Sequence, residues 1–163
     1  MAHYKLVLEE ACEDEYSLVA IHCSEAAYKM AYLLNQHTHL RLHRQRRDVD
    51  FSKDGLSITF PWFSFENKQQ YIHYHLVANK CKSAAAKTVS GGGLFAASEE
   101  ENTHLHYLIP EYKNVDYFLK IQSENTLPSL RKLLLEMNEI QPVISAYSLA
   151  PENIKSKNNL IFN

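Results

Sequence analysis

Histidine occurs three times in this sequence as a pair with one residue between the two imidazoles. The pairs are His37/His39, His73/His75 and His104/His106. Because residues two positions apart on a β-strand point the same way, each pair could offer two nitrogen ligands to a metal ion. The alternative is the polar face of an ordinary amphipathic strand, since apolar residues alternate with the second and third pairs. We favour this alternative and predict no metal and no cofactor. The metal candidates that remain are His73, His75, His104 and His106.

Arginine is concentrated in one short segment. Four of the five arginines lie there, and they are Arg41, Arg44, Arg46 and Arg47. Guanidinium groups bind phosphates and carboxylates, and aromatic side chains, which are plentiful here, stack on the bases of single-stranded RNA. The simpler interpretation is a solvated loop whose arginines pair with Asp48, Asp50 or the acidic stretch 9–15. A partner-binding patch comes next, and RNA is one form of that partner.

The sequence contains none of the short patterns of common enzyme classes. Neither G-x-S-x-G, H-E-x-x-H nor the glycine pattern of dinucleotide-binding folds occurs. The cysteines are Cys12, Cys23 and Cys81, an odd number with no C-x-x-C pair. Such a set is typical of buried thiols in a reducing compartment. We therefore nominate no catalytic residue and expect a protein that is not an enzyme.

Composition excludes several further classes of protein. The chain has 163 residues, of which 45% are hydrophobic and four are glycine, so it is neither disordered nor collagen-like. With 17 Lys and Arg against 19 Asp and Glu, it is not a strongly basic nucleic-acid coat protein. This length supports one domain with a full hydrophobic core. We see no secretory leader and no apolar run of about 18 residues, so we expect a cytoplasmic protein that does not bind membranes.

Two amphipathic helices are predicted to position these residues. The first is expected at about residues 24–36 with Ser24 as its N-cap, and the second at about 127–139 with Thr126 as its N-cap. Their apolar side chains recur at the spacing of one helical face, at Ala27, Met30, Ala31 and Leu34 and again at Leu130, Leu133, Leu134 and Met137.

Alternating or continuous apolar segments predict strands around these helices. They lie at about residues 4–8, 16–23, 40–43, 56–65, 71–80, 104–109, 115–122 and 143–149. The order predicts an α+β fold, a two-layer sandwich with a mostly antiparallel sheet. We expect a single domain over 1–150 with a flexible loop at about 82–102. The tail 151–163 is expected to fray unless its apolar end docks. Pro61 suggests a sheet edge, where strand pairing could support a homodimer.

A longer motif lies ahead of one of the predicted strands. Residues 109–119 read IPEYKNVDYFL. The segment resembles the small family from Bacteroidota that is named for its IPExxxVDYFL motif, and every named position matches. Residues 21–35 (IHCSEAAYKMAYLLN) and 76–81 (LVANKC) also resemble that family, so the resemblance covers most of the chain. It implies an intracellular protein and supplies no catalytic residue.

The same motif has a physical interpretation. Pro110 favours an extended Ile109 and starts a turn, which either sets the register of the following strand or faces a partner. The partner-binding candidates are Pro110, Glu111, Asp116 and Tyr117. Taken together, the sequence predicts a small non-enzymatic adaptor or regulatory module that binds a protein. The alternative is an RNA-associated factor that uses the Arg41–Arg47 patch, and a metal-binding protein or an enzyme ranks behind both.

Overall fold

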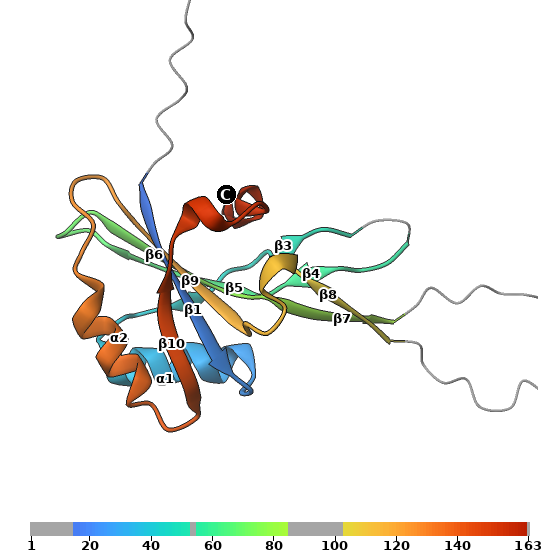
Figure 1. Ribbon diagram of the computed structural model, residues 1–163, viewed down its shortest axis with the longest axis horizontal. Helices are drawn as coiled ribbons and strands as arrows, with labels where there is room; N and C mark the ends of the chain where they lie inside the picture. The colour runs from blue at the N-terminus through green and yellow to red at the C-terminus, as the bar shows by residue number, and fades with distance from the viewer. Residues whose placement is uncertain (1–14, 53–54, 85–102, 163) are drawn as a thin grey trace, which may run out of the picture.

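A six-stranded antiparallel sheet forms the centre of the molecule. The computed structural model describes residues 15–52, 55–84 and 103–162. The strands lie in the order β10-β1-β9-β6-β5-β2 (Figure 1). Their bounds are Tyr16–Cys23 (β1), His43–Arg44 (β2), Trp62–Asn67 (β5), Ile72–Ala78 (β6), Tyr117–Ser123 (β9) and Val143–Leu149 (β10). Each neighbouring pair runs antiparallel, so the predicted α+β fold with a mostly antiparallel sheet is confirmed.

Two helices pack on one face of this sheet, α1 (Ala27–Thr38) and α2 (Leu130–Asn138). They are the two helices that the apolar spacing predicts. Each begins three residues later than expected, and the predicted N-caps at Ser24 and Thr126 are wrong. Within the described part of the chain, no helix is long and apolar enough to cross a membrane.

The late helix starts have different physical causes. Before α1, the Asp116 carboxylate accepts a hydrogen bond from the Cys23 amide, and the Tyr117 hydroxyl donates to the Glu25 carbonyl. The Cys23 amide and the Glu25 carbonyl are thus bonded to side chains from another segment, at the place where the first turn of the helix was expected. Before α2, Pro128 disfavours helical backbone in the residue ahead of it, so the helix begins beyond the proline.

The central strands β1 and β9 are buried on both faces, which explains the continuous apolar run in β1. Val19 and Ile21 point toward the helices, where Met30, Leu34 and Met137 cover them. Leu18 and Ala20, the alternate residues, point to the opposite face and are equally inaccessible. A strand with both faces buried needs apolar residues at successive positions, as the sequence YSLVAIHC provides.

Turns and the C-terminal segment cover the face of the sheet that the helices leave open. Ile154 and Leu160 are buried there against Leu18 and Phe118. The buried Lys120 ammonium donates to the Leu160 carbonyl at 2.8 Å. Figure 1 shows this segment on the side of the sheet away from α1 and α2. The apolar end of the tail therefore docks and becomes part of the core.

Two hairpins extend from one end of the central sheet (Figure 1). The strands are β3 (Val49–Asp50) with β4 (Thr59–Phe60), and β7 (Lys80–Ala84) with β8 (Thr103–Tyr107). Pro61 separates β4 from β5, so the strand predicted over 56–65 is divided between two sheets. Likewise, Asn79 separates β6 from β7 within the strand predicted over 71–80.

Several predictions from sequence fall outside the described residues. These are the strand at 4–8, Cys12, most of the acidic stretch and residues 85–102 of the predicted loop. The beginning of that loop, at Lys82, belongs instead to strand β7, which pairs with β8.

Candidate functional site

The turn that carries the 109–119 motif is held by one buried amide side chain. Asn79 is 0% exposed and accepts a hydrogen bond from the Ile109 amide at 2.8 Å. Its Nδ2 donates to the carbonyls of Tyr112 and Val115, both at 2.9 Å. The Asn79 backbone also bonds to Leu108 and Asp116. Because these five bonds hold both ends of the turn, Asn79 fixes its shape.

Asn79 does not appear among the residues that the sequence singles out. One signal was available, a lone amide inside the apolar string LVANKC. The partners of its side chain lie 30 to 36 residues away in the sequence, so no local pattern reveals them.

Asp116 of the motif is engaged within the fold. One carboxylate oxygen accepts the Cys23 amide at 2.9 Å, and the other lies 2.6 Å from the Lys80 ammonium. The backbone amide of Asp116 donates to the Ile21 carbonyl. The side chain therefore joins the end of β1 to the start of β7. These contacts favour a structural role for Asp116, one of the two interpretations that the sequence left open.

Tyr117 is likewise engaged. The side chain is 7% exposed, and its hydroxyl donates to the Glu25 carbonyl ahead of α1. Burial, with Cys23, Asp116 and Glu25 nearby, raises the pKa of Tyr117 to about 12. The phenol therefore stays protonated at neutral pH and acts as a hydrogen-bond donor.

Pro110 and Glu111 lie at the surface in the short 3-10 helix η1 (Pro110–Tyr112). A Glu111 carboxylate oxygen accepts bonds from the Ser156 amide at 2.8 Å and the Ser156 hydroxyl at 3.0 Å. Burial pushes the pKa of Glu111 upward, but hydrogen bonds from its own backbone, Ser156 and Lys155 together lower it. Glu111 thus tethers the C-terminal segment, and Pro110 is the motif residue that faces an open groove.

This groove is a hollow on the described surface that is lined mainly by apolar side chains. It has a volume of about 450 Å³ and lies between the two hairpins and η1. Its walls include Phe51, Phe60, Leu105, Tyr107 and Pro110. Phe51 and Leu105 are 39% and 44% exposed, so part of each large apolar side chain is open to solvent in this hollow. We call this hollow the hairpin groove.

The hairpin groove carries positive charge and no negative charge among its lining residues. Lys113 is the one fully charged residue in its lining, and His106 and Asn159 supply the other polar side chains outside the apolar walls. The Lys113 ammonium lies 5.8 Å from the centre of the Tyr107 ring. The sequence did not single out Phe51 or Leu105, since their significance depends on two hairpins meeting.

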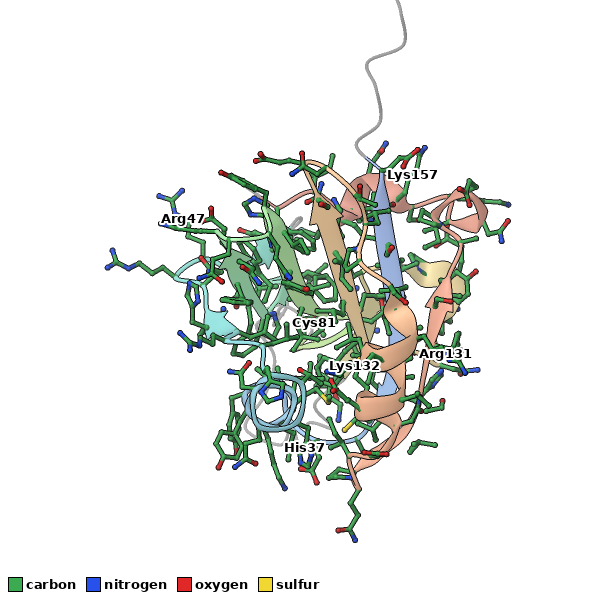
Figure 2. The ribbon with its side chains drawn as sticks, turned by 90° about the vertical axis from the view of Figure 1, so that its left-hand side faces the viewer. His37, Arg47, Cys81, Arg131, Lys132 and Lys157 are labelled. Carbon is green, nitrogen blue, oxygen red and sulfur yellow. The ribbon has the colours of Figure 1, made fainter. Side chains whose placement is uncertain are left out.

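The arginine segment forms a second hollow, of about 390 Å³, at the β2 edge of the sheet. His43, Arg44, Arg46, Arg47 and Trp62 line it, and we call it the arginine cleft. Arg41 is exposed as well but does not line the cleft. Figure 2 shows the Arg47 side chain pointing away from the body of the protein, far from Arg131 on α2. The cleft and the hairpin groove share no lining residue.

The paired histidines do not converge. His73 and His75 stack in parallel on β6, 6.5 Å apart, whereas His104 and His106 lie on β8 in another sheet. The His106 Nε2 lies 2.8 Å from the Ser83 hydroxyl, within hydrogen-bond distance. Among the described residues, no three His, Cys, Asp or Glu side chains come together in a way that could hold a metal ion.

His75 occupies a crowded aromatic site below the C-terminal segment. Its ring lies 5.0 Å from Phe162 and 5.6 Å from Trp62. Burial, the Lys120 charge and His73 lower the pKa of His75 to about 4. This imidazole is therefore neutral at physiological pH, and its Nδ1 has no hydrogen-bond partner among the described residues.

The described cysteines are free thiols. Cys23 is buried, and burial raises the pKa of its thiol. A protonated thiol is a poor nucleophile, so the local environment works against thiolate chemistry at Cys23.

Comparison with known proteins identifies no relative. No family model, no curated protein and no solved structure matches the chain.

Proposed function

We propose that the protein is a non-enzymatic adaptor or regulatory module, and that the hairpin groove receives an apolar segment of a partner protein. The observation that carries this proposal is that Phe51 and Leu105, both exposed, line the same hollow as Pro110. Burying such side chains in a concave site is a main source of binding energy in protein interfaces, at roughly 25 cal/mol per Å² of apolar area.

The charge of the groove indicates the chemistry of the partner segment. Lys113 is the charged residue of the lining, and no carboxylate lies among the lining residues. An apolar segment that also carries Asp or Glu would therefore match both the walls and the charge. We infer an acidic-apolar peptide segment as the class of ligand.

Membership of the IPExxxVDYFL family remains a proposal that rests on residues 109–119 and the two further segments. On this proposal the motif acts indirectly. Asn79, Asp116 and Tyr117 hold the turn, and the turn presents Pro110 to the groove.

The test is a native pull-down with mass spectrometry, with and without nuclease, using wild type and two variants. Leu105→Asp places a carboxylate in the groove wall. Ile144→Asp is the matched control, because Ile144 is 77% exposed on β10 and does not line the groove. We expect a partner that survives nuclease, is lost with Leu105→Asp and is kept with Ile144→Asp. If no partner depends on Leu105, the proposal is wrong.

A homodimer is tested in the same material. Light scattering on purified wild type and Leu105→Asp reports the mass of each. A dimer that Leu105→Asp converts to a monomer would replace the foreign partner with a second copy of this chain. The nucleic-acid alternative depends on the arginine cleft and is therefore independent of both outcomes.

A further inference from the structure

In the arginine cleft, no carboxylate of the described residues neutralises the positive charge of Arg46 and Arg47. Asp48 pairs with Arg44, and the Asp50 carboxylate accepts the Ser52 amide at 2.7 Å. The side chains of Arg46 and Arg47 are exposed and form no hydrogen bond or ion pair with the described part of the chain. Among the described residues, the interpretation as a loop with internally paired charges therefore holds for Arg44 and not for these two neighbours, and most of the acidic stretch 9–15 lies outside those residues.

The backbone of the cleft is fixed even without a ligand. The Trp62 indole donates to the Arg47 carbonyl at 2.6 Å, and Arg44 donates to the Gln45 carbonyl at 2.9 Å. The Gln45 side chain reaches the Ser64 hydroxyl on β5 at 2.6 Å. A ligand would have to order only the ends of the free arginines, so little conformational entropy is lost on binding.

Both the chemistry and the extent of the segment point to a polyanion. Arginine forks match the paired oxygens of a phosphate, and Trp62 supplies an aromatic wall. Along this run Arg41, Arg46 and Arg47 are all exposed, which offers more guanidinium groups than a single phosphate needs. Its charge also contrasts with the net charge of −2 of the whole chain.

We propose that the arginine cleft binds the phosphate backbone of single-stranded nucleic acid through Arg46 and Arg47, with Arg41 as a flanking contact. This activity is assigned to other lining residues than those of the hairpin groove. Sequence recognition is not part of the proposal, since phosphate contacts carry no base information.

The test is the binding of a fluorescently labelled single-stranded RNA of mixed sequence, followed by anisotropy at about 50 mM and about 200 mM salt. Three phosphate contacts predict a slope of log affinity against log salt of about −2, which is a loss of about 20-fold between these concentrations. Replacing both Arg46 and Arg47 with Ala should reduce this loss to about threefold and weaken binding at low salt by at least about tenfold. Arg44 is kept in every variant because its pair with Asp48 shapes the loop.

Arg131→Ala is the matched control. Arg131 is exposed on α2, on the other side of the molecule from Arg47 (Figure 2). It should bind RNA as wild type does, and circular dichroism should show both variants folded. Binding that survives the double replacement, or that Arg131→Ala weakens equally, would refute the cleft.

Two further ligands distinguish the sources of phosphate. A phosphoserine peptide and inorganic phosphate are titrated against the same proteins. We expect weak competition from both, since each presents one phosphate to a site with several arginines. If the phosphopeptide binds in an Arg46- and Arg47-dependent way and RNA does not, nucleic acid is the wrong ligand and the proposal fails.

Discussion

Replacing Asn79 with alanine tests the claim that one buried amide holds the motif turn. The change removes the acceptor of the Ile109 amide and the donor to the Val115 carbonyl, both in fully buried bonds. It also removes the bond to the Tyr112 carbonyl, which is partly buried and can be replaced by water.

The magnitude follows from the groups left without partners. A buried amide or carbonyl that loses its partner costs about 1–3 kcal/mol, so two of them predict about 4 kcal/mol. That is a large share of the roughly 5–15 kcal/mol by which a domain is stable. For a chain of this size it corresponds to a fall of about 8–16 °C in Tm.

Urea unfolding followed by the fluorescence of Trp62, the one tryptophan in the chain, measures this cost. Asn138→Ala is the matched control, because Asn138 also bonds to backbone, at the amide and the carbonyl of Ala146. Asn138 is exposed, so water can take its place and the expected cost is about 1 kcal/mol or less. Equal losses in the two variants would contradict the argument that burial of Asn79 sets the cost.

Two further measurements examine the sheet face below the C-terminal segment. The pKa of His75 is about 4 in the folded state and near 6.5 in an unfolded chain. Between these pH values the unfolded state binds the proton more strongly, so the stability of the fold decreases as pH falls from 6.5 to 4. With allowance for the partial exposure of the ring, the free energy of unfolding of wild type should fall by about 1–2 kcal/mol more than that of His75→Phe between pH 7 and pH 5. The control His104→Phe, at an exposed position, should behave as wild type. Urea unfolding at both pH values measures the difference. Leu160→Ala, at a position that is 0% exposed, should cost about 2–5 kcal/mol in the same unfolding assay, and a loss below about 1 kcal/mol would mean that the segment does not dock in solution.

The sequence by itself determined the elements and the fold class. The spacing of Met30, Leu34 and Met137 selects one face of each helix, and that face packs on the sheet. Tyr74 and Leu76 turn to the core while His73 and His75 alternate with them. These features are readable because a period of 3.6 or 2 is a local property of the chain.

Tertiary structure alone decided where strands end and what the motif residues do. Nothing local separates Ala78 from Lys80, but Asn79 between them binds backbone 30 to 36 residues away, and the strand is divided there. The sequence leaves Asp116 and Tyr117 open between a structural role and recognition, and their hydrogen-bond partners, the Cys23 amide at the end of β1 and the Glu25 carbonyl just after it, engage both side chains within the fold.

The hairpin groove has the same origin. Phe51, Leu105 and Pro110 come from three segments that are distant in sequence, and no one of them carries a binding signal by itself. The arginine cleft stands between the two cases. Its arginine content is evident from the sequence. Which arginines form no ion pair with the described residues depends on the pairing of Asp48 with Arg44 and on the hydrogen bond from Trp62 to the loop backbone. Periodicity thus determined what each element buries, whereas side-chain hydrogen bonds between distant segments determined which polar groups remain available to a partner.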